Sequence, residues 1–144
     1  MLKNKKTVYI ICSLAILAIV FLLFLLLKGG TINVKKVNNI TIISEEENLK
    51  VSISNSNDIL EFANLLNKNP SNNSFSCPFG YVKFIIEEGY NTIVIYPATD
   101  GCHNFRIEGE SKYFSINNNE WESLVNILGK YGVDRFLLES GKGI

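Results

Sequence analysis

The sequence predicts an α+β fold, in which a single N-terminal transmembrane helix precedes a mainly antiparallel sheet with helices packed on one face. Three observations predict it. Residues 7–27 form one unbroken apolar run, several later segments alternate apolar and polar residues between turn sequences, and two segments space their apolar residues as a helix does. The expected order of elements after the apolar run is β-β-α-β-β-β-β-α.

The apolar run TVYIICSLAILAIVFLLFLLL contains no charged residue, proline or glycine. As a helix it would extend about 31 Å, close to the hydrocarbon thickness of a bilayer. We therefore expect a cytoplasmic N-terminus at 1–6, a single-pass signal-anchor helix at 7–27, a linker at 28–36 and an extracytoplasmic domain at 37–144. Lysines at 3, 5 and 6 favour this orientation in the cell membrane. A cleaved signal peptide is the alternative, but its apolar core is usually shorter.

Charge argues against one class of partner. All fourteen acidic residues, but only ten of the fourteen basic ones, follow Lys28. The domain is therefore mildly acidic, and we expect no nucleic-acid partner.

The first half of the domain is predicted to be a hairpin and a helix. NNITIIS and NLKVSIS read as strands joined by a turn at SEEEN. In NDILEFANLLNK, Ile59, Phe62 and Leu66 recur at helical spacing. Asp58 and Glu61 resemble a capping box at its start, and Pro70 follows its end.

The second half predicts two further hairpins with defined registers. A type II′ turn at Gly89-Tyr90 sets Phe84 opposite Ile95 and Ile86 opposite Ile93. Gly109-Glu110 is a second turn of this kind and sets Phe105 opposite Phe114. Between the hairpins, a three-residue loop sets Ile95 against Ile107, whereas a two-residue loop sets it against Arg106. Matching of the apolar faces favours the longer loop, with Gly101 at positive φ.

A last helix is expected around Trp121, Leu124 and Leu128. Asn117 with Glu120, or Asn119 with Glu122, can cap its start. For the tail VDRFLLESGKGI the sequence allows two structures, a short additional strand or a loosely packed end.

The stretch ATDGCHNF places an Asp, a Gly, a Cys and the only histidine of the chain in one short turn. We predict that Cys77 and Cys102 form a structural disulfide, because they are an even pair brought to the same hairpin end. A redox-active pair lacks the C-x-x-C spacing, and zinc would find only two cysteines and one histidine, so no metal or cofactor is expected. Asp100 and His103 are the weak candidates for a polar or catalytic site.

A second candidate site is the sheet face opposite Phe84 and Ile95. It carries the half-apolar, tyrosine-containing set Tyr81, Lys83, Ile85, Val94 and Tyr96. Such a face is typical of a protein-binding surface, unless a second layer such as the C-terminal tail covers it.

The segments ILEFANLLN, DGC, IEGESKYFSI and WESLVNILGKYG together resemble a broad group of small membrane-anchored envelope proteins of low-GC Gram-positive bacteria. The resemblance is one of pattern over most of the chain. It implies an anchor with a short α+β ectodomain and gives no catalytic residue.

The leading functional hypothesis is a non-enzymatic, membrane-tethered interaction module outside the cytoplasm, with an envelope or secreted protein as partner. It would bind through the exposed sheet face or through the first loop, NKNPSNNSFSCP. Two alternatives remain: an immunity or inhibitor protein directed against a secreted toxin or hydrolase, and an enzyme centred on Asp100 and His103.

Overall fold

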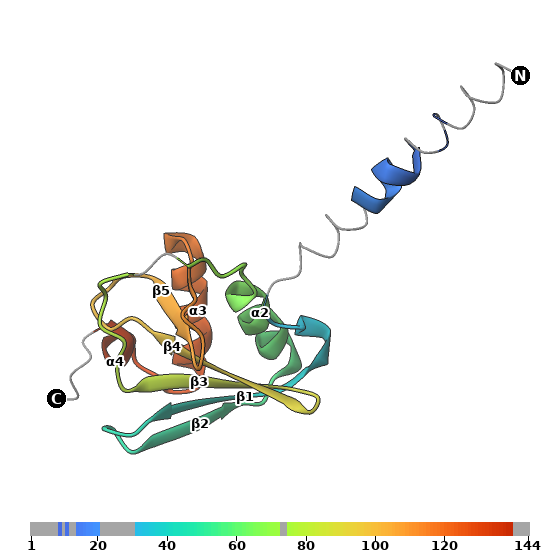
Figure 1. Ribbon diagram of the computed structural model, residues 1–144. Helices are drawn as coiled ribbons and strands as arrows, with labels where there is room; N and C mark the ends of the chain where they lie inside the picture. The colour runs from blue at the N-terminus through green and yellow to red at the C-terminus, as the bar shows by residue number, and fades with distance from the viewer. Residues whose placement is uncertain (1–8, 10, 12–13, 21–30, 73–74, 140–144) are drawn as a thin grey trace, which may run out of the picture.

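The computed structural model describes residues 9, 11, 14–20, 31–72 and 75–139 (Figure 1). The predicted α+β class is confirmed, with helices and one six-stranded antiparallel sheet. The strands are β1 (Val37–Ser44), β2 (Leu49–Ile53), β3 (Val82–Glu88), β4 (Asn91–Pro97), β5 (Asn104–Ile107) and β6 (Tyr113–Ser115). The helices are the 3-10 turn η1 (Val34–Lys36), α2 (Ser56–Leu66), α3 (Asn118–Lys130) and α4 (Arg135–Glu139).

The sheet has the strand order β2-β1-β3-β4-β5-β6. Helix α2 connects β2 to β3 and carries the chain back to the free side of β1, so that β3 pairs with β1. The predicted registers are confirmed: Phe84 pairs with Ile95, Ile95 with Ile107, and Phe105 with Phe114. The pairing of Ile95 with Ile107 shows that the longer of the two possible loops forms, and Gly101 within it has the predicted positive φ, 75°.

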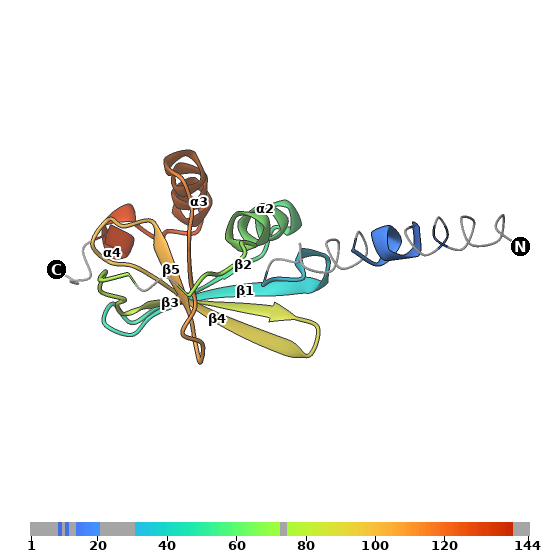
Figure 2. The same ribbon diagram turned by 45° about the horizontal axis from the view of Figure 1, so that its top comes forward.

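Both long helices lie on the same side of the sheet, as Figure 2 shows. Their apolar stripes meet the inward side chains of the strands in one core, because strand residues of alternate position face the same way. The largest fully buried side chains include Trp121, Phe62, Phe84 and Phe105. The opposite side of the sheet carries no helix among the described residues.

The helix starts partly differ from expectation. Helix α2 begins at Ser56, and its N-cap is Asn55, whose side chain accepts hydrogen bonds from the backbone N–H groups of Asn57 and Asp58. Asp58 is not the cap, because it bonds Lys130 and Tyr131 of the α3 end instead. Helix α3 has the capping box of Asn117 and Glu120, the first of the two predicted pairs.

Part of the predicted linker at 28–36 belongs to the domain. Ile32 is buried in the core, and its backbone N–H donates to Oδ1 of Asn67 at 3.1 Å. The backbone N–H of Asn33 donates to Glu88 Oε2 at 2.6 Å. Residues 31–36 therefore lie beside the ends of α2 and β3 and are hydrogen-bonded to both through Ile32 and Asn33. Residues 28–30 lie outside the described residues.

The prediction of a transmembrane, single-pass signal-anchor helix at 7–27 is wrong for the part of the chain that the structure describes. No helix among those residues is long and apolar enough to cross a membrane. Residues 1–8, 10, 12–13 and 21–27 of the predicted N-terminus and span lie outside the described residues.

The tail forms neither a strand nor a loose end up to Glu139. It turns at Gly132, which has a φ of 77°, and continues into α4. Leu138 is buried in the core, and Glu139 accepts a hydrogen bond from Trp121 Nε1 at 3.2 Å. Up to Glu139, the tail therefore packs with α3, and these described residues do not form a second layer over the other side of the sheet (Figure 2).

Candidate functional site

The helix-free side of the sheet, called the open face below, contains the five residues predicted as a binding surface. Alternation along the strands places Thr41 opposite Ile85 and Ile85 opposite Val94, in a row across β1, β3 and β4. Ile85 and Val94 are half-buried by their neighbours in the sheet. Tyr81, just before β3, is 55% exposed. The open face thus has an apolar centre with a large exposed aromatic residue beside it.

Charged and hydroxyl groups at its margins are mostly paired. Lys83 Nζ donates to Glu45 Oε1 at 2.8 Å, and Tyr96 Oη donates to Glu108 Oε1 at 2.7 Å. The hydrogen bond to Glu45 raises the pKa of Lys83, and the hydrogen bond to Glu108 raises the pKa of Tyr96. Lys83 is therefore a cation and Tyr96 a neutral phenol at pH 7, so neither is prepared for acid–base chemistry.

Arg106 is a residue of the open face that the sequence analysis did not single out. It lies between Tyr96 and Tyr113 in the strand register, on the open face. Its guanidinium carbon is 4.9 Å from the ring centroid of Tyr96 and 5.6 Å from that of Phe79, so the planar group lies between two aromatic rings. Its Nε is buried and has no hydrogen-bond partner within the described chain.

The segment before β3 contacts Arg106 and its neighbour Tyr113. Ser71 forms an isolated antiparallel bridge with Tyr113, and the Tyr113 ring lies 6.0 Å from Phe75 and 5.5 Å from Phe79, centroid to centroid. This part of the chain therefore packs against the β6 end of the open face, whereas Ile85 and Val94 at the centre are partly exposed. Aromatic residues at 75 and 79 were visible in the sequence, but their position depends on how the segment crosses the sheet edge.

The corner of Cys77, Asp100 and Cys102 holds the two cysteines of the predicted disulfide, which lie at one hairpin end as the register predicted. Asp100 joins them there, although the sequence analysis had grouped it with His103. Ligand atoms of the three residues, the two Sγ atoms and a carboxylate oxygen, all lie within 4.8 Å of one another. Both cysteines are free thiols in this structure, so the predicted disulfide stays a prediction. The thiol of Cys77 and the carboxylate of Asp100 raise the pKa of Cys102 to about 12. Cys102 is therefore a poor nucleophile at pH 7.

Asp100 and His103 do not form a dyad. Asp100 Oδ1 accepts a hydrogen bond from the backbone N–H of Cys102 at 3.1 Å, and hydrogen bonding to Cys102 lowers the pKa of Asp100. His103 stacks on Trp121 instead, with ring centroids 4.6 Å apart and ring planes 14° from parallel. Within the described residues no hydrogen bond joins the carboxylate to the imidazole, so this geometry supplies no oriented general base.

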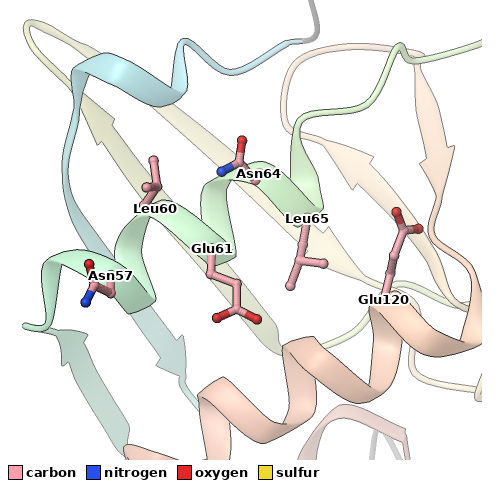
Figure 3. Close-up of a pocket in the computed structure, with 6 residues that line it drawn as sticks. All are labelled: Asn57, Leu60, Glu61, Asn64, Leu65 and Glu120. Atoms are coloured by element: carbon pink, nitrogen blue, oxygen red, sulfur yellow. The ribbon is translucent and has the colours of Figure 1, made fainter.

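A groove between α2 and α3 is another concave feature, with a volume of about 440 Å³ (Figure 3). Glu61 and Leu65 point from α2 toward α3, and Glu120 stands at the α3 end, where it forms an ion pair with Lys68. The groove is open and its polar groups do not converge on one point. We therefore place the candidate functional site on the open face and not between the helices.

Comparison with known proteins gives no identity on which to base a function: the chain matches no protein-family model, no curated protein and no solved structure.

Proposed function

We propose that the chain is a non-enzymatic protein-interaction module that binds its partner through the open face. The observation that carries this proposal is Arg106, a cation held between aromatic rings beside an apolar sheet centre, with no hydrogen bond or ion pair to any described residue. Arginine and tyrosine are the residue types that most often dominate the free energy of protein association.

The surroundings of Arg106 indicate the chemistry of the partner. A guanidinium binds a carboxylate through two parallel hydrogen bonds, and its fixed position between Phe79 and Tyr96 reduces the side-chain entropy lost on binding. Ile85 and Val94 offer apolar area next to it. The partner should therefore present an exposed Asp, Glu or C-terminal carboxylate with apolar side chains beside it.

Two substitutions with matched controls test the proposal. The full chain is immobilised and incubated with an extract of its native cells, and the proteins retained are compared between variants. We expect Val94→Glu and Arg106→Gln to lose a specific retained protein. The controls are Asn126→Glu on α3, which also introduces a carboxylate, and Arg135→Gln on α4, which also removes a guanidinium, and both should keep it.

Equal retention by the open-face variants and the controls would contradict the proposal. A retained protein that is a toxin or hydrolase and loses activity on binding would identify the inhibitor form of the same function. Circular dichroism of each variant separates lost binding from lost folding.

A further inference from the structure

We propose that, when its thiols are reduced, the corner of Cys77, Asp100 and Cys102 binds one thiophilic divalent cation of the Zn²⁺ type. The ligands are the two sulfur atoms and one Asp100 carboxylate oxygen. This proposal is independent of the function proposed for the open face.

The distances suit a tetrahedral ion after small side-chain adjustments. With Zn–S bonds of about 2.3 Å and Zn–O bonds of about 2.1 Å, ligand atoms of a tetrahedral site lie about 3.6–3.8 Å apart. The three ligand atoms already lie within 4.8 Å of one another. Each therefore needs to move by no more than about 1 Å, which rotation of side chains at a turn can supply.

The donor set selects the class of metal. Two thiolates favour Zn²⁺ and similar soft or borderline ions over Mg²⁺ and Ca²⁺, which prefer oxygen ligands. The carboxylate completes three protein ligands and leaves the fourth position for water. Binding of the ion releases the thiol protons, and the divalent cation then balances the charge of the resulting thiolates and of the carboxylate.

Neighbouring groups already orient two of the ligands. Asn104 Nδ2 donates to Cys77 Sγ at 3.2 Å, a contact of the kind that supports metal-bound thiolates. The backbone N–H of Cys102 donates to Asp100 Oδ1 at 3.1 Å, which fixes the carboxylate and leaves its second oxygen for the ion. All three ligands come from the two segments that flank the β4 end, Cys77 before β3 and the β4–β5 turn.

The ligand set differs from the one that the sequence suggested. By residue type, the sequence suggested the two cysteines and His103 as the possible zinc ligands. In the structure, His103 stacks on Trp121 and is absent from the cluster. Asp100 takes that position because the tight turn at Gly101 folds its side chain back toward Cys102.

The proposed metal site and the predicted disulfide exclude each other, because both consume the two thiols. Oxidation of the pair forms one S–S bond and releases two protons and two electrons, which a disulfide such as oxidised glutathione accepts by exchange. Metal binding should therefore be present in the reduced chain and absent in the oxidised one.

Titration of the reduced full chain with Co²⁺ tests the proposal directly. The chain carries Cys12→Ser, so that only the two corner thiols remain, and is kept reduced with a phosphine. We expect one Co²⁺ per chain, with the near-ultraviolet thiolate-to-cobalt charge-transfer absorption and the visible bands of a tetrahedral ion. Zn²⁺ should displace the Co²⁺ and abolish both signals.

Variants identify the ligands. Cys77→Ser and Cys102→Ser should each remove the charge-transfer signal, and Asp100→Asn should weaken binding at least about tenfold. Asp134→Asn, the same change at an aspartate outside the cluster, should leave binding unchanged. No charge-transfer band at a large excess of Co²⁺, or an unchanged band in either serine variant, would overturn the site; unchanged affinity in Asp100→Asn would overturn the ligand set.

Discussion

The stacking of His103 on Trp121 gives the sharpest prediction of this structure, because it separates a packing role for the only histidine from a catalytic one. The indole is 2% exposed, and the imidazole lies against it at 4.6 Å in a nearly parallel arrangement. We predict that His103→Ala destabilises the fold, whereas His103→Phe, which keeps a flat ring at the same position, preserves it.

The magnitude follows from two losses. A stacked aromatic pair contributes about 0.5–1.5 kcal/mol beyond its buried area. Uncovering one face of the indole adds about 1 kcal/mol at about 25 cal/mol per Å² of apolar surface. We therefore expect His103→Ala to lower the free energy of unfolding by about 1.5–2.5 kcal/mol, and His103→Phe to change it by less than about 0.5 kcal/mol.

Urea unfolding followed by fluorescence measures both values, because Trp121 is the only tryptophan in the chain. Tyr90→Ala, at a fully exposed aromatic residue in the β3–β4 turn, is the control and should leave stability unchanged. If His103→Ala matches the wild type, or if His103→Phe is as unstable as His103→Ala, the packing role is refuted.

Three further predictions concern contacts between segments that are distant in the sequence. The hydrogen bond from Lys130 lowers the pKa of Asp58 in the folded state. The ionised Asp58 therefore stabilises the fold fully above its unfolded pKa of about 4, and this stabilisation is lost as the pH falls through the lower pKa of the folded state. Asp58→Asn should flatten the dependence of the unfolding free energy on pH in this acid range. Gly80→Ala should cost about 1–3 kcal/mol in urea unfolding, because its Cβ would lie 2.3 Å from Thr99 Cγ2. Oxidation of Cys77 and Cys102 should raise the Tm by on the order of 10 °C and remove both thiols from titration; two reactive thiols in natively prepared Cys12→Ser protein would count against the bridge.

The strand registers were predictable because they depend on local sequence. The turn glycines fix the loop lengths, and a one-residue slip would turn Phe84, Ile95 and Phe105 out of the core. The path of α2 and the resulting neighbour of β1 were not predictable in this way, since both depend on contacts distant in the sequence. The burial of Ile32 was not predictable either, because its segment has the sequence of a linker and its contacts are with residues distant in the sequence.

The same distinction between local sequence and long-range contacts applies to the candidate sites. Alternation within one hairpin was enough to place Val94 and Ile85 on a common face and to bring Cys77 near Cys102. The position of Arg106 between Phe79 and Tyr96 requires knowing how the segment before β3 crosses the sheet edge. A single sequence gives no signal for that path, because it is set by Pro78, Gly80 and their tertiary contacts.

We propose that the open face is the surface through which the chain binds another protein. Site-specific photo-crosslinking in the native cells tests it most directly, with the photoreactive residue at Val94 on the open face or, as the control, at the exposed position Asn126 on α3. We predict one discrete protein adduct from position 94, lost when Arg106→Gln is added, and none from position 126. Adducts of equal yield from both positions, or none from position 94, would contradict the claim.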